Sequence, residues 1–161
     1  MPRSDSENRI TPSVFDRLID QEPRLSTEGI ASRATTLRQL KESVKRDLEN
    51  LLNTRQVVDE VPADLKELSH SLAAYGLPDF TNISIHNPQD YYKLQRAIEN
   101  AIALFEPRLE EVTVAILPPD ERERAMHFRV DARLKIEPAP EPVTFDTILE
   151  IHKGEYKVKG G

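Results

Sequence analysis

Two stretches of the chain repeat apolar residues at the three- and four-residue spacing of an amphipathic helix. Between Thr36 and Thr54 the apolar positions are Leu37, Leu40, Val44, Leu48, Leu51 and Leu52. After Asn87, a capping residue followed by a proline at the first helical position, they are Tyr91, Leu94, Ile98, Ala101, Ile102 and Phe105. We therefore predict two long helices, each with one buried face, and expect the second to end near Pro107.

Two shorter helices are predicted at weaker signals. Thr11 followed by Pro12 is typical of a helix start, so a short helix should run from there to about Asp20. Residues 64 to 75 favour another, closed by Gly76. The apolar positions are Val14, Phe15, Leu18 and Ile19 in the first and Leu65, Leu68 and Leu72 in the second. Residues 21 to 34 are interpreted as a connection, and residues 1 to 10 as a mobile tail.

Beyond Pro107 the period changes to two, which indicates strands. The alternating segments are residues 112 to 117, 128 to 136, 143 to 151 and, after a turn at Gly154, 155 to 158. Alternation of this kind predicts an antiparallel sheet that is covered on one face only. The fold class is therefore α+β, with N-terminal helices packed on one face of a C-terminal antiparallel sheet. Residues 137 to 142, EPAPEP, should form a stiff connection, and residues 118 to 126, PPDERERAM, a protruding loop.

Length and charge narrow the class of protein. The 161 residues fit a single domain, expected over residues 11 to 161. With 28 acidic and 22 basic residues the net charge is −6, which argues against a nucleic-acid partner. The chain has no cysteine, no apolar run long enough to span a membrane, and no secretory signal at its start. We expect a cytoplasmic protein without direct membrane insertion.

One segment departs from this acidic balance. Between Arg33 and Arg55 there are six basic and three acidic residues, a local charge of +3. A solvated helix face is the favoured interpretation, because helix surfaces commonly carry such charges. A docking surface for an acidic partner is the alternative.

Residues of the kinds that carry catalysis or bind metals form no motif in this sequence. The four histidines lack paired metal-ligand spacing, so no metal or cofactor is expected. The five glycines form neither a phosphate-binding loop nor a dinucleotide fingerprint. Carboxylates are plentiful, and a glycosidase needs only two at the right separation, so a hydrolase stays open.

The junction of the second long helix with the sheet carries the sequence Glu106-Pro107-Arg108. Proline biases the preceding residue toward an extended conformation, so the helix should end there. If the segment is extended, Glu106 and Arg108 project to the same side and can form an ion pair or grip a partner together. Composition alone favours an ordinary junction salt bridge.

Four strings, in this order along the chain, resemble one family. They are VFDRL from Val14, VKRDLENLLNTR from Val44, YGLPD from Tyr75 and AIALFEPRLEEVTV from Ala101. Over about residues 14 to 151 the chain resembles the TssE family of type VI secretion system baseplate subunits. This family is related to the sheath-initiating wedge proteins of contractile phage tails and is often labelled lysozyme-like. The phage branch usually carries a Gly-Glu-Arg string after the long helix, and this chain does not.

The resemblance implies a non-enzymatic assembly subunit that links the baseplate wedge to the first ring of the contractile sheath, at the inner face of the inner membrane. Implied partners are the wedge subunits TssF, TssG and TssK and the sheath subunits TssB and TssC. Candidate partner-binding residues are Glu106, Pro107, Arg108, Arg46 and Arg55. A one-sided sheet agrees with this, because a partner strand can add to an open edge. We expect Glu106→Ala or Arg108→Ala to weaken co-purification while the isolated chain stays folded.

The alternative reading is a peptidoglycan-cleaving, lysozyme-like glycosidase with Glu106 as its acid. A third reading is an unrelated adaptor domain.

Overall fold

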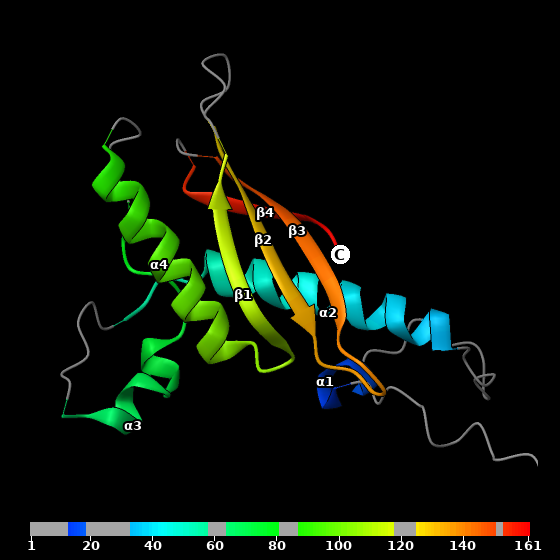
Figure 1. Ribbon diagram of the computed structural model, residues 1–161. Coiled ribbons are helices and arrows are strands. Elements are labelled where there is room, and N and C mark those ends of the chain that lie inside the picture. Colours follow the sequence, from blue (N-terminus) through cyan, green and yellow to red (C-terminus); the bar gives the residue numbers. More distant parts are fainter. Residues whose placement is uncertain (1–12, 19–32, 58–63, 81–86, 118–124, 151–152) are drawn as a thin grey trace, which may run out of the picture.

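The computed structural model describes residues 13–18, 33–57, 64–80, 87–117, 125–150 and 153–161. The predicted mobile tail, the capping Thr11 and most of the connection 21–34 lie outside these residues, as does most of the loop 118–126. The chain first forms helices and then a four-stranded sheet, so the predicted α+β class is confirmed (Figure 1).

Both long helices are present. The first, α2, spans Arg33–Asn53 and begins three residues earlier than predicted. The second, α4, spans Pro88–Phe105, and the side chain of Asn87 accepts a hydrogen bond from the backbone N–H of Gln89 at 3.0 Å. This bond satisfies a donor that the first helical turn leaves unpaired, so the predicted cap is confirmed.

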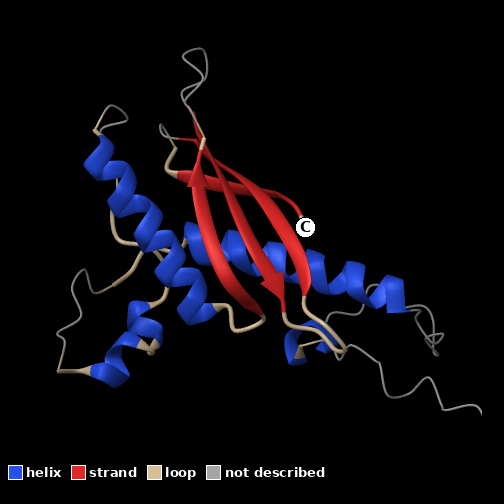
Figure 2. Cartoon of the chain, in the orientation of Figure 1, coloured by secondary structure: helices blue, strands red, loops and turns tan. Residues whose placement is uncertain are grey.

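The sheet is antiparallel throughout, in the order β1-β2-β3-β4 (Figure 2). The strands are β1, Leu109–Ile116; β2, Ala125–Leu134; β3, Glu141–Glu150; and β4, Glu155–Gly160. The β1 strand begins three residues earlier than predicted, because a bulge between Glu110 and Thr113, with Glu111 at a φ of 53°, adds residues that alternation does not count. The β3 strand also starts earlier, since Glu141 and Pro142 pair with β2.

The helices cover one face of the sheet, as predicted. Figure 1 shows α4 beside β1 and α2 crossing behind the strands. The buried side chains of both helices and of alternate strand positions form one core. Its most enclosed members are Leu48, Leu51, Leu94, Ile98, Ile102, Phe128 and Phe145. The other face carries exposed cross-strand pairs, such as Arg129 with Asp146 at 3.0 Å.

The prediction of one helix over residues 64 to 75 is wrong. The segment forms a short α3, Lys66–Ser69, and a separate 3-10 turn, η2, Leu72–Ala74. The break lies at Ser71, whose side chain accepts from the N–H of Ala73 and donates to the carbonyl of Leu68. Because this side chain competes for backbone groups, the helix does not continue. Leu72, expected on a buried face, is 85% exposed.

The first helix, α1, spans Val14–Leu18. Its N-terminus is capped by Ser13, whose Oγ accepts from the N–H of Asp16 at 3.1 Å. Val14, Phe15 and Leu18 are each more than half exposed, so this short helix does not bury its apolar residues. None of the described helices combines the length and apolar character that crossing a bilayer requires.

Candidate partner-binding site

Glu106, Pro107 and Arg108 form the corner at which α4 passes into β1. The helix ends at Phe105, and the N–H of Glu106 makes its last helical bond to the carbonyl of Ile102 at 2.9 Å. On the far side of the corner, the carbonyl of Arg108 accepts from the N–H of Lys135, which follows β2. The corner is therefore fixed at both ends by backbone hydrogen bonds.

The predicted pairing of Glu106 with Arg108 is confirmed. Nε of Arg108 donates to one carboxylate oxygen of Glu106 at 2.6 Å, and Nη2 donates to the other at 2.5 Å. Glu106 is only 4% exposed, so this pair is not the ordinary surface salt bridge that composition favoured. Buried ionic groups need their partners, because desolvation of an unpaired charge costs several kcal/mol.

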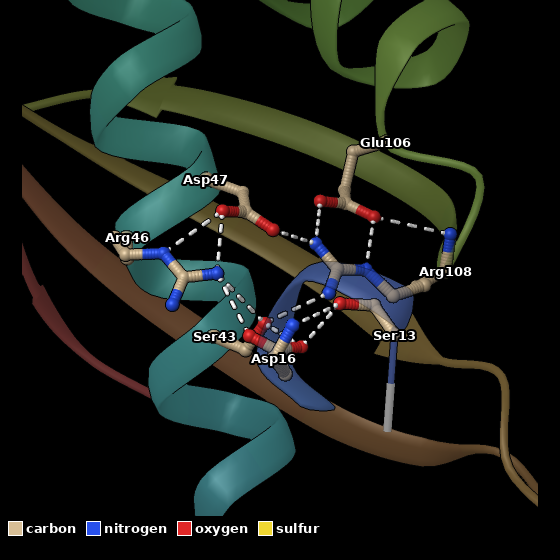
Figure 3. Close-up of polar contacts among 7 residues, drawn as sticks. All are labelled: Ser13, Asp16, Ser43, Arg46, Asp47, Glu106 and Arg108. Carbon is tan, nitrogen blue, oxygen red and sulfur yellow. Dashed lines mark hydrogen bonds and ion pairs between the residues drawn. The ribbon is translucent and has the colours of Figure 1, made fainter. Parts of the chain in front are cut away.

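Arg108 also joins the corner to α2. Its Nη2 donates to Oδ2 of Asp47 at 2.6 Å, and its Nη1 donates to Oγ of Ser43 at 3.0 Å (Figure 3). Burial alone would lower the pKa of Arg108, but the hydrogen bonds and charges of Glu106 and Asp47 outweigh it and raise that pKa. The guanidinium thus stays charged and holds two carboxylates from elements that are remote in sequence.

Arg46 continues the same network toward α1. Its Nε and Nη2 donate to Oδ1 of Asp47 at 3.1 and 3.0 Å, and Nη2 donates to Oδ1 of Asp16 at 2.8 Å. The guanidinium also lies over the ring of Phe15, 5.1 Å from its centroid, a geometry that favours cation–π attraction. Oγ of Ser43 donates to Asp16 at 2.7 Å. We name this group of Ser13, Asp16, Ser43, Arg46, Asp47, Glu106 and Arg108 the corner network (Figure 3).

Four of the five candidate partner-binding residues lie at the corner. Glu106, Arg108 and Arg46 belong to the corner network and Pro107 lies between the first two, whereas Arg55 lies beyond the C-terminal end of α2. Arg55 is paired with Asp79 at 3.2 Å, and its side chain is 68% exposed. Arg55 lies apart from the other four because α2 continues for several residues past the corner. A partner-binding role for these five residues stays a prediction.

Sequence reasoning missed Asp16, Ser43 and Asp47 as members of the site. Asp16 and Asp47 nevertheless lie within two of the four strings that carried the family resemblance, so their position in those strings was the available signal. The basic run on α2 is largely neutralised, since Lys41 pairs with Glu141, Lys45 with Glu42, and Arg46 with two aspartates. This outcome favours the solvated face over a docking surface for an acidic partner.

Asp16 should titrate at unusually low pH. Burial would raise its pKa, but hydrogen bonds from Ser13, Ser43 and Arg46, together with the charge of Arg46, lower that pKa from 3.8 to about 2. A lowered pKa stabilises the folded state above the ordinary value, and this contribution is lost as the pH falls from about 4 toward 2. We expect an NMR titration of the Asp16 carboxyl carbon to give a pKa near 2. In Arg46→Gln the value should move back toward 3.8, and an unchanged value would argue against the ion pair.

The described residues include no group of three or more histidine or acidic side chains arranged to hold a metal ion. In the corner network every carboxylate instead accepts from arginine. The network therefore joins α1, α2 and the α4–β1 corner.

Comparison with known proteins places this architecture in a family. The model of the family of baseplate wedge protein gp25 matches residues 38–139, and the chain belongs to that family. The family is one of structural baseplate components. The matched region contains most of α2 and all of α4, β1 and β2, and thus most of the corner network.

A chain in the solved structure described as "The baseplate complex from the type VI secretion system" is similar to this one, with 22% sequence identity and a TM-score of 0.47. The similarity covers 69% of this chain and 94% of that chain. Comparison with curated proteins found no match.

Proposed function

We propose that this chain is a non-catalytic baseplate subunit of a type VI secretion system, and that it links the wedge to the first ring of the contractile sheath by strand addition. Membership of the wedge family supports the baseplate role. The four TssE-like strings support the secretion-system branch. The partners proposed are TssF, TssG and TssK at the corner network and TssB and TssC at a sheet edge, at the cytoplasmic face of the inner membrane.

The observation that carries the sheath linkage is the order of the sheet. In this four-stranded order β1 and β4 are the two edges, and each has an outer row of backbone groups that no other described strand pairs. Such a row is a template for one more strand. Main-chain hydrogen bonds would supply affinity, and the surrounding charges would set the register.

Among the residues that the structure describes, a helix side chain bonds each edge at one position. On β4, Asn53 accepts from the N–H of Tyr156 at 2.8 Å and donates to its carbonyl at 2.9 Å. On β1, a carboxylate oxygen of Glu99 accepts from the N–H of Val114 at 3.1 Å. Only the carbonyl of Tyr156 is capped in this way, because Glu99 offers Val114 no donor. We therefore propose β1 as the edge that receives the sheath strand.

A single proline at an outward backbone position tests this assignment. The N–H of Val114 points away from β2, toward Glu99. Backbone N–H groups point to opposite sides at successive residues of a strand, so the N–H of Ile116, two residues on, also points away from β2. Ile116→Pro removes an outward donor without removing a bond to β2, and we expect it to abolish co-purification with TssB and TssC. Val158→Pro, at the corresponding outward position of β4, is the matched control and should retain binding. Thermal unfolding establishes that both variants are folded.

The opposite result, in which only Val158→Pro loses the sheath subunits, would move strand addition to β4. Retention of both sheath subunits by both variants would contradict strand addition altogether.

The glycosidase alternative gains no support from this geometry. Both oxygens of Glu106 accept hydrogen bonds from Arg108, an arrangement that suits a carboxylate and not an acid that must donate a proton. The neighbouring carboxylates, Asp16 and Asp47, are likewise held by Arg46.

A further inference from the structure

A hollow of about 410 Å³ opens beside the corner network. Residues of several elements line it, among them Asp47, Glu106, Arg108, Tyr75, Phe105 and Pro107. Ser13, the residue just before α1, also borders it. Residues of three of the four family-like strings thus line the hollow, and Ser13 directly precedes the fourth.

The charged groups of the hollow favour a cation. Asp47 and Glu106 line the hollow beside one guanidinium, Arg108, while Arg46 holds Asp47 from outside it. With Asp16 included, the corner network counts three carboxylates against two guanidiniums. Nε, Nη1 and Nη2 of Arg108 already donate to Glu106, Ser43 and Asp47, so an incoming anion would have to displace one of them. A carboxylate accepts up to about four hydrogen bonds, so Asp47 and Glu106 retain capacity for a new donor.

The aromatic side chains that line the hollow also suit a planar cation. Tyr75 and Phe105 pack edge to face, with ring centroids 5.2 Å apart. The pKa of the Tyr75 hydroxyl is raised, first by burial and then by the charges of Asp47 and Glu106, so negative potential extends to this ring. A guanidinium is planar, stacks on aromatic rings and donates to carboxylates through paired N–H groups.

We propose that this hollow binds an arginine side chain of a partner chain, whose guanidinium would bond Asp47 and Glu106 and lie against Tyr75 and Phe105. The proposal deepens the proposed function by giving the chemistry of the partner at the corner, and it rests on that function for the existence of a partner. The exposed Val14, Phe15 and Leu18 of α1, which begins next to the hollow, would contact apolar residues that flank the arginine.

The test uses the full ¹⁵N-labelled chain and the probe N-acetyl-L-arginine amide, with N-acetyl-L-citrulline amide as the neutral isostere. We expect the arginine probe to shift the backbone amide signals of Tyr75, Phe105 and Arg108 and to saturate in the millimolar range. The citrulline probe should bind about tenfold more weakly, because it lacks the charge. Equal binding of both probes, or no saturable shift at these amides, would overturn the proposal.

Two variants locate the binding. Asp47→Asn removes one carboxylate and should weaken the arginine probe about fivefold or more. Asp146→Asn, which makes the same change on the exposed face of the sheet, is the matched control and should leave the affinity unchanged. Equal affinities in the two variants would refute the site, and the amide spectrum of each shows that it is folded.

The two proposals fail separately. Retained sheath co-purification in Ile116→Pro would count against strand addition at β1 only, whereas absence of saturable arginine binding would count against the hollow only. The sequence also carries Arg9 shortly before Ser13. If the arginine probe binds Arg9→Gln but not the unchanged chain, the hollow is a site for the chain's own Arg9, and the assignment to a partner is overturned.

Discussion

Arg108→Met should lower the free energy of unfolding by about 3 to 5 kcal/mol at neutral pH, because it leaves the carboxylate of Glu106 buried without a counter-charge. Glu106 is 4% exposed, and Arg108 donates to both of its oxygens. Urea unfolding at neutral pH measures the loss.

The matched control for this prediction removes both charges of the pair. Glu106→Gln combined with Arg108→Met removes the buried carboxylate together with its partner and leaves Asp47 held by Arg46, so its loss should be below about 2 kcal/mol. A double variant as unstable as Arg108→Met would show that packing of the arginine stem, and not charge, stabilises the corner. If the double variant is folded, it should also lose co-purification with the wedge subunits, which the single variants cannot test cleanly because they destabilise the fold.

Gly76→Ala should lower the free energy of unfolding by about 3 to 5 kcal/mol through two separate effects. Gly76 has a φ of 107°, which strains any residue with a side chain. A Cβ at this position would lie 2.2 Å from the carbonyl oxygen of Thr54, which accepts from the N–H of Leu77 at 2.8 Å. The methyl group would therefore break the link between the end of α2 and the segment that carries Tyr75.

Gly154→Ala is the matched control for the second prediction. Gly154 also has a positive φ, 66°, but no atom lies within 4 Å of a Cβ built there. Its loss should be about 1 kcal/mol, which is the cost of the left-handed conformation alone. Equal losses in the two variants, measured by thermal unfolding, would contradict the steric argument at Thr54.

Local signals in the sequence predicted those parts of the fold that depend on neighbouring residues. The Asn87-Pro88 start of α4 depends on one side chain and one ring, both visible in the sequence. Strand alternation depends on which residues a single face buries, and it identified all four strands. The bulge at Glu111 and the break at Ser71 were not predicted. At each place the regular backbone hydrogen bonding is interrupted, and the spacing of hydrophobic residues carries no signal of such an interruption.

The candidate site was predicted only as far as residues adjacent in sequence. Glu106 and Arg108 are two residues apart, so their pairing follows from an extended backbone. Ser43 contacts Arg108 across 65 positions and Asp16 across 27, and these contacts depend on how α1 and α2 dock. No periodicity specifies that docking. For the same reason, the strings that resembled a family located Asp16 and Asp47 better than physical reasoning about individual residues did.

The bidentate contact between Asn53 and Tyr156 bears on how copies of this chain avoid sticking to one another. The unpaired backbone groups of an edge strand can pair with the same edge of a second molecule. The Asn53 amide bonds both the N–H and the C=O of Tyr156, so these two groups are not available for such pairing. On the proposed assignment β4 keeps this contact after assembly, and β1 is the edge that pairs with a neighbour. One sheet would thus present one edge protected against self-association and one edge open to a partner strand.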